Sequence, residues 1–223
     1  MSIEKNIQNI REKLPGGCRL IAVTKTHPVE LLTEAYNAGQ KVFGENKVQE
    51  MVEKYEKLPK DIEWHMIGHL QSNKVKYIAP FVSLIHSIDS IKLLTEVNKQ
   101  AFKIQKVINC LLQIHIALEE TKFGFLPDEA KELIGSKELE NLKNIKIIGL
   151  MGLATNTEDT LQIKKEFKSI KSLFDDIKGI KKANVDVSEL SIGMSSDYFL
   201  AIEEGSTLIR VGSAIFGNRN YNI

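Results

Sequence analysis

The stretch at residues 20–30 reads LIAVTKTHPVE and places a lysine directly after a short apolar run. The run Arg19–Thr24 has the length and the β-rich composition of a buried strand. A His-Pro pair then opens a helical pattern that ends at Gly39, because proline favours the first turn of a helix and glycine follows the last. The stretch therefore predicts a strand followed by a helix, with Lys25 at the junction.

The same strand-and-helix unit recurs along the chain. Runs typical of strands lie at Arg19–Thr24, Lys41–Glu45, Ile62–Ile67, Val82–Ile88, Val107–Ile116, Ile145–Gly152, Val187–Ile192 and Leu208–Phe216. Start and stop signals predict helices at His27–Ala38, Val48–Leu58, Leu70–Ala79, Ser90–Lys103, Pro127–Leu142, Asp159–Lys178 and Ser195–Glu204. Strands that alternate with helices pair in parallel, because each helix returns the chain to the same end of the sheet.

Eight such strands predict an α/β fold, a single (β/α)8 TIM barrel formed by residues 1–223. An open doubly wound sheet is the alternative, but neither G-x-G-x-x-G nor G-x-x-x-x-G-K-[ST] occurs in the chain. The predicted helix Asp159–Lys178 carries one apolar stripe of barely two heptads. We interpret this stripe as a face packed on the sheet rather than as a coiled-coil seam.

Composition narrows the class of protein. The net charge is +1, without the basic excess that nucleic-acid or anionic-membrane binding requires. No stretch approaches the roughly 18 apolar residues of a membrane span, and the first residues, MSIEKNIQNIREKL, lack the apolar centre of a signal peptide. Cys18 and Cys110 show neither metal nor disulfide spacing. We expect a reduced, cytoplasmic protein.

Lys25 is the first candidate functional residue. In a barrel, sites lie at the C-terminal ends of the strands, and Lys25 shares a strand face with Ile21 and Val23, which we expect to point inward. Desolvation would lower the pKa of such a lysine and leave more neutral amine, the form that attacks a carbonyl to give a Schiff base. The alternative is a lysine that only extends into solvent from the end of a strand.

Two loops near the end of the chain predict a phosphate site. SIGMSSDY at 191–198 reads as a strand, a small polar loop and a helix start, and TLIRVGSAIFG at 207–217 contains a tight Gly-Ser turn. Hydroxyls and the free amides of a helix N-terminus bind anions, and barrels often build a phosphate site from the loops after strands seven and eight. The candidate residues are Ser195, Ser196, Gly212 and Ser213.

Arg210 lies two residues before the Gly-Ser turn on the same strand face. A buried arginine needs an acceptor, so an ion pair with Glu45 or another carboxylate would explain it, as would a ligand. A Schiff-base lysine, a phosphate site and a nearby arginine together suggest pyridoxal 5′-phosphate (PLP).

Seven stretches in order resemble the pyridoxal phosphate homeostasis protein family. They are AVTKTHP (22–28), FGENKVQE (43–50), WHMIGHLQSNK (64–74), TKFGF (121–125), GLMGLAT (149–155), SIGMSSDYFLAI (191–202) and GSTLIRVGSAIFGNR (205–219). WHMIGHLQSNK and GMSSD are the most specific. The resemblance implies an alanine-racemase N-terminal-domain-like barrel without the C-terminal β-domain.

The resemblance also implies that PLP is bound covalently to Lys25, that the two loops contact its phosphate, and that an arginine faces its pyridine nitrogen. Asn46 and His65, at the ends of strands two and three, would lie near the cofactor. The cofactor residues that it implies are Lys25, Asn46, His65, Ser195, Ser196, Arg210, Gly212 and Ser213.

An arginine at the pyridine nitrogen disfavours its protonation, so strongly stabilised carbanions are not expected. Alanine racemases add a tyrosine base from a C-terminal domain, which we do not expect here, and neither Tyr198 nor Tyr221 fits that role. We assign no catalytic residue. We expect a monomer that holds, buffers or delivers PLP, with PLP-dependent apo-enzymes as recipients.

Three other functions stay open: a weak PLP-dependent amino-acid racemase, a Schiff-base aldolase for sugar phosphates, and a partner-binding scaffold. His65 and His69 have a spacing that suits a metal on a helix, but His65 falls on a strand end and no H-E-x-x-H motif is present, so we predict no metal. Lys122 could reach the site or only solvent.

Overall fold

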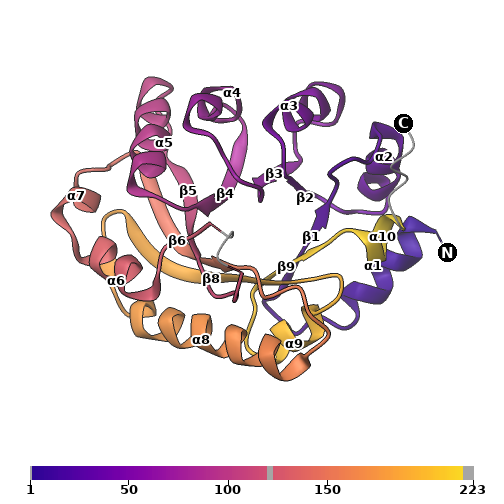
Figure 1. The fold of residues 1–223 in the computed structure, drawn as a ribbon. Helices are drawn as coiled ribbons and strands as arrows, with labels where there is room; N and C mark the ends of the chain where they lie inside the picture. Colours follow the sequence, from indigo (N-terminus) through magenta and orange to yellow (C-terminus); the bar gives the residue numbers. More distant parts are fainter. Residues whose placement is uncertain (1, 120–122, 218–223) are drawn as a thin grey trace.

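The computed structural model describes residues 2–119 and 123–217, which form a closed parallel barrel surrounded by helices (Figure 1). The barrel strands are β1 (Arg19–Val23), β2 (Val42–Glu45), β3 (Glu63–Met66), β4 (Val82–Ile88), β5 (Ile108–Ile114), β6 (Ile145–Gly152), β8 (Val185–Met194) and β9 (Leu208–Val211). Each pairs in parallel with its neighbour, and the pairs β1–β9 and β6–β8 close the ring. The predicted (β/α)8 barrel is confirmed.

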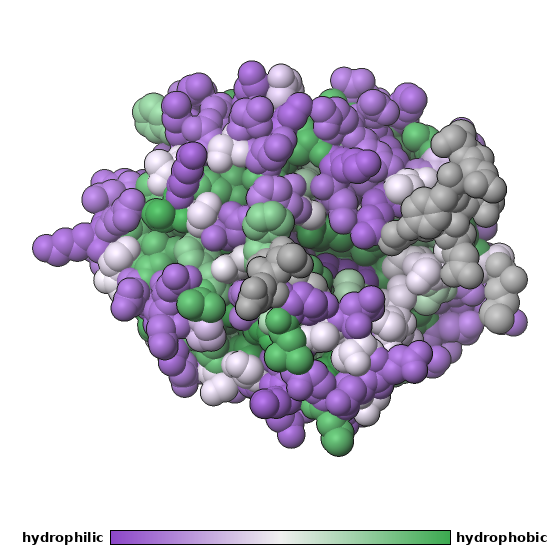
Figure 2. Space-filling view, in the orientation of Figure 1, coloured by the Kyte–Doolittle hydropathy of each residue, from purple (hydrophilic) through white to green (hydrophobic). Residues whose placement is uncertain are grey.

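The helices pack around the outside of the barrel. They are α1 (Ile3–Arg11), α2 (Val29–Asn37), α3 (Val48–Lys57), α4 (Val75–Ile78), α5 (Ile91–Lys103), α6 (Pro127–Gly135), α7 (Lys137–Glu140), α8 (Thr160–Lys178), α9 (Tyr198–Glu203) and α10 (Ser213–Phe216), with the short 3-10 helix η1 (Ser72–Lys74). The apolar stripe of α8 is buried and α8 contacts β6 and β8, as predicted. Hydrophilic side chains cover much of the outer surface (Figure 2).

Several predicted boundaries were wrong. The last strand ends at Val211, because the chain turns at Gly212 into α10. The predicted helix Pro127–Leu142 is broken at Ser136, which has an extended backbone and caps α7 through its hydroxyl. The predicted helix at 70–79 begins only at Ser72, as a 3-10 turn. The structure also has α1 and a two-residue strand, β7 (Lys181–Lys182), which pairs antiparallel with β8 and which the pattern did not predict.

Two hydrophobic clusters lie on the two sides of the barrel wall. The larger one fills the space between the strands and the helices. The smaller one consists of Ile21, Leu84, Leu111, Met151 and Leu208, which come from strands that are not all neighbours. Such residues can meet only inside the ring, so Ile21 points inward as predicted. No helix among the described residues has the length and apolar character to cross a bilayer.

Candidate functional site

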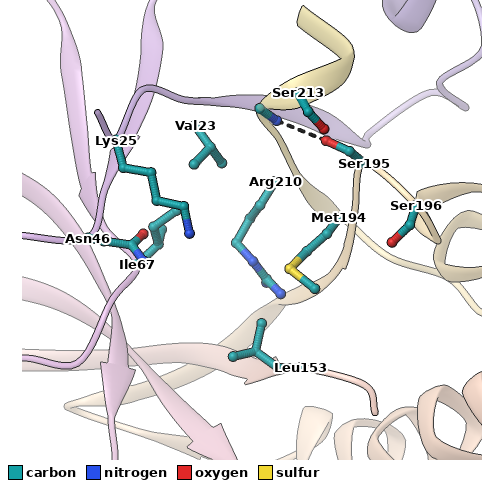
Figure 3. A pocket seen from close by; sticks show the side chains of 11 residues that line it. Val23, Lys25, Asn46, Ile67, Leu153, Met194, Ser195, Ser196, Arg210 and Ser213 are labelled. Atoms are coloured by element: carbon teal, nitrogen blue, oxygen red, sulfur yellow. Dashed lines mark hydrogen bonds between the residues drawn. The ribbon is translucent and has the colours of Figure 1, made fainter. Parts of the chain in front are cut away.

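A cavity of about 440 Å³ opens at the C-terminal end of the barrel (Figure 3). It is lined by Val23, Lys25, Asn46, Ile67, Leu153, Met194, Ser195, Ser196, Arg210, Gly212 and Ser213. All the predicted site residues except His65 therefore line this one cavity. They meet because β1 pairs with both β2 and β9, and β9 pairs with β8, so the loops after these four strands are adjacent.

Lys25 projects from the turn that follows β1. Its side chain extends into the cavity, as does that of Arg210 (Figure 3). The next residue, Thr26, has φ 66°, in the left-handed region, which a β-branched residue rarely adopts. The surrounding structure must hold this turn in place.

The loops after β8 and β9 are joined by a hydrogen bond. The amide of Gly212 donates to Ser195 Oγ over 3.1 Å (Figure 3). A Cβ on Gly212 would lie 3.2 Å from the carbonyl oxygen of Val23, so glycine permits the close approach of β9 to β1. The amides of Ile215 and Phe216 donate to the carbonyl of Gly212, so the first amides of α10, those of Ser213 and Ala214, are the ones without an acceptor within the helix. Ser213 lines the cavity.

The helix predicted at Ser195–Glu204 begins three residues late. The amide of Met194 donates to Asp197 Oδ1 over 2.5 Å, and the amide of Asp197 donates to the carbonyl of Met194 over 3.1 Å. These bonds fold 194–197 into a turn before α9 starts. Ser195 and Ser196 therefore sit on this turn rather than in a helix.

Arg210 is buried and binds neutral acceptors. Its Nη1 donates to the carbonyl (2.7 Å) and to Oγ (2.5 Å) of Ser191, and its Nη2 donates to the carbonyl of Gly152 (2.8 Å). Burial lowers the pKa of Arg210 to about 10, although the charge of Asp197 opposes the shift. The suggested ion pair with Glu45 does not form, because Glu45 binds Lys54 instead over 2.6 Å. Arg210 thus presents a cation to the cavity.

His65 lies inside the barrel and does not line the cavity. Its Nδ1 is 3.0 Å from His86 Nε2, and His86 Nδ1 is 3.0 Å from Ser191 Oγ. Burial lowers the pKa of both histidines, that of His65 to about 3, so both are neutral near pH 7. Since Arg210 can only donate, Ser191 Oγ accepts from it and at the same time contacts His86 Nδ1, which continues the chain to His65. This chain of neutral side chains holds the guanidinium of Arg210 from the interior of the barrel.

The sequence analysis missed Ser191 and His86. The signal was a polar residue within an apolar strand, as in VSLIHSI at 82–88. His69 is far more exposed than His65, lies 3.1 Å from Asp89 and stacks on Phe123, so the two histidines do not form a pair.

Tyr198 is buried on α9 and is not among the residues that line the cavity. Lys122 and Tyr221 lie outside the described residues.

The fold and the site define a class of protein. The sequence matches the family described as "Alanine racemase, N-terminal domain" over residues 1–220. The structure of alanine racemase from Clostridium difficile superposes with a TM-score of 0.75, covering 99% of this chain and 60% of that chain, at 16% identity. At that identity the likeness shows the fold alone. The class is thus the alanine-racemase-type barrel.

More similar sequences narrow the class. The chain is 44% identical over 221 residues to the pyridoxal phosphate homeostasis protein of Aquifex aeolicus, covering 97% of this chain and 95% of the relative. For the protein of the same name from Pasteurella multocida the identity is 38% over 236 residues, with 100% of both chains covered. The chain belongs to the pyridoxal phosphate homeostasis protein family.

PipY of Synechococcus elongatus has been solved without PLP and with PLP bound. The TM-scores against these two structures are 0.91 and 0.87, each at 34% identity and covering 97% of this chain and 100% of PipY.

Proposed function

We propose that this protein binds PLP in the cavity, links it to Lys25 as a Schiff base, and holds, buffers or delivers it in intracellular vitamin B6 homeostasis. The observation that carries the proposal is that Lys25, the Arg210 cation and two hydroxyl-bearing loops line one cavity. The names of the relatives and the PLP-bound structure of PipY support the same ligand.

The chemistry of the lining residues fits PLP. The cavity, about 440 Å³, is within the usual range for small-molecule sites. The amine of Lys25 is the group that forms a Schiff base with an aldehyde such as that of PLP. The hydroxyls of Ser195, Ser196 and Ser213 and the first amides of α10 suit a phosphate. A side chain on Gly212 would crowd the phosphate loop against β1.

When bound, PLP supplies an aldehyde and an electron-accepting ring. Lys25 would supply the amine that condenses with this aldehyde, with a C=N bond in place of C=O and the oxygen released as water. Arg210, a permanent donor, would bind a pyridine nitrogen only in its unprotonated form. An unprotonated ring is a weak electron sink, which favours retention of the cofactor over turnover of a substrate.

Borohydride reduction followed by peptide mass mapping tests this proposal. Hydride reduction of the C=N bond would leave a stable phosphopyridoxyl group on Lys25. Lys25→Ala should abolish this adduct and retain weaker, non-covalent binding through the phosphate loops. Lys57→Ala, on the exposed side of α3, is the matched control. An unmodified Lys25 after incubation with excess PLP would refute the proposal.

The alanine-racemase-type fold favours one second candidate, a weak PLP-dependent amino-acid racemase. Loss of deuterium from the α-carbon of alanine, above the rate with free PLP, would support it. The buried position of Tyr198, away from the cavity lining, favours the carrier role. Delivery to PLP-dependent apo-enzymes, a monomeric state and a cytoplasmic location belong to the same proposal.

A further inference from the structure

The turn that carries Lys25 is anchored by a buried lysine from α3. Lys54 Nζ donates to the carbonyl of Thr24 (2.7 Å), to Glu45 Oε1 (2.6 Å) and to Glu50 Oε1 (3.0 Å). An ammonium group has three donors, so these acceptors use all of them. The Lys54 side chain is 6% exposed and that of Glu45 is fully buried.

The two carboxylates that bind Lys54 also bind the residues on either side of Lys25. Thr24 Oγ1 donates to Glu45 Oε1 over 2.5 Å. The amide of Thr26 donates to Glu50 Oε1 over 2.6 Å. The backbone is therefore fixed immediately before and immediately after Lys25 by one connected set of charges.

The bond to Glu50 coincides with the unusual backbone of Thr26. A threonine at φ 66° is strained, and such a conformation persists only where its surroundings hold it. Thr26 is exposed, so burial of its own side chain does not hold it. Within the turn, the Thr26 hydroxyl donates to the carbonyl of Lys25 (2.6 Å) and the His27 amide donates to the carbonyl of Thr24 (3.1 Å). The bond from the Thr26 amide to Glu50 ties this turn to α3.

Stability alone does not account for this network. A buried ion pair is often no more stabilising than apolar residues of the same volume, because desolvation offsets the attraction. What it supplies instead is a fixed geometry. Orientation of a reacting group has large effects on rate, and a displacement of about 1 Å can slow a reaction by roughly a hundredfold.

We propose that Lys54 and Glu50 are positioning residues that hold the backbone of Lys25 so that its amine meets the aldehyde of PLP. This inference rests on the proposed function of Lys25. It predicts that breaking the network slows attachment of PLP while leaving the phosphate contacts intact.

The test compares Lys54→Met with Lys57→Met, the same substitution at an exposed position of the same helix. The rate of attachment is followed by borohydride trapping over time and mass analysis of the Lys25 peptide. Affinity for pyridoxine 5′-phosphate, which has no aldehyde, reports the other contacts. We expect Lys54→Met to slow attachment about tenfold or more with unchanged affinity for pyridoxine 5′-phosphate, and Lys57→Met to change neither.

Glu50→Ala is the second variant, because Glu50 is only partly buried and its loss leaves the Lys54–Glu45 pair in place. We expect slower attachment and, in the ligand-free protein, faster hydrogen exchange at the Thr26 amide. Glu56→Ala, exposed on α3, is its control.

The outcomes separate the two proposals. Wild-type attachment rates in folded Lys54→Met or Glu50→Ala would overturn the positioning role alone. Absence of any adduct in the wild-type protein would overturn the proposed function and this inference with it.

Discussion

Replacement of Ser191 by alanine removes the hydroxyl at the centre of the chain from Arg210 to His65. Its Oγ accepts a hydrogen bond from Arg210 at 2.5 Å and contacts His86 Nδ1 at 3.0 Å. A hydrogen bond to a charged group contributes about 1.5–3 kcal/mol, and a buried polar atom left without a partner costs about 1–3 kcal/mol.

The two effects of this substitution share one atom, so they do not add fully. Arg210 also keeps two backbone acceptors, the carbonyls of Ser191 and Gly152. We expect Ser191→Ala to lower the free energy of unfolding by about 3 kcal/mol. At about 2–4 °C per kcal/mol for a chain of this size, the Tm should fall by about 6–12 °C.

Ser87→Ala is the matched control, because Ser87 is a buried serine on β4 and its Oγ has no hydrogen-bond partner within the described residues. Removal of an unsatisfied hydroxyl should leave stability unchanged or raise it by up to about 1 kcal/mol. Urea denaturation and calorimetry measure both variants. Equal losses in the two, or no loss in Ser191→Ala, would refute the hydrogen-bonded chain.

Two further predictions concern the barrel interior. Burial lowers the pKa of His65 to about 3 and that of His86 well below its usual value, so the unfolded chain binds more protons at acidic pH. Unfolding should become easier by about 1.4 kcal/mol per pH unit for each histidine once the pH lies below about 6.5, the usual histidine pKa. Urea denaturation at about pH 7 and about pH 5 tests this; equal free energies would contradict it. Gly149→Ala should destabilise by about 3 kcal/mol or more, because its Cβ would lie 1.7 Å from the carbonyl oxygen of Glu189. Gly135→Ala, with open space around the new methyl group, should be neutral or gain a few tenths of a kcal/mol; a similar loss in both would refute the steric argument.

The sequence was sufficient to predict those parts of the site that depend only on the order of the strands. Lys25, Arg210 and Gly212 meet because they follow or end strands that a closed barrel must bring together, and strand order alone implies this. His65 could not be placed in the same way. His65 lies within β3 (Glu63–Met66), and Ile67, two residues later on the same face, lines the cavity in its place. The pattern did not fix how far along the strand the cavity begins.

The contacts that organise the site were also beyond the sequence pattern. The Lys54–Glu45 pair joins a helix to a strand end, and Ser191 and His86 lie 105 residues apart. No periodicity links such residues, since their contact depends on side-chain packing in three dimensions. Likewise, Glu45 was considered as a partner for Arg210 because charge alone does not distinguish two buried cations.

The pairing of β1 with β9 places the site across the seam where the barrel closes. Ser213 follows Lys25 by 188 residues, so almost the whole chain must be synthesised before both halves of the cavity exist. Contacts of such large sequence separation form late and slowly. A ligand that needs both halves binds only the closed barrel and stabilises that state by mass action. A newly synthesised chain would therefore bind the ligand only after the barrel has closed. The ligand would not assist the earlier steps of folding.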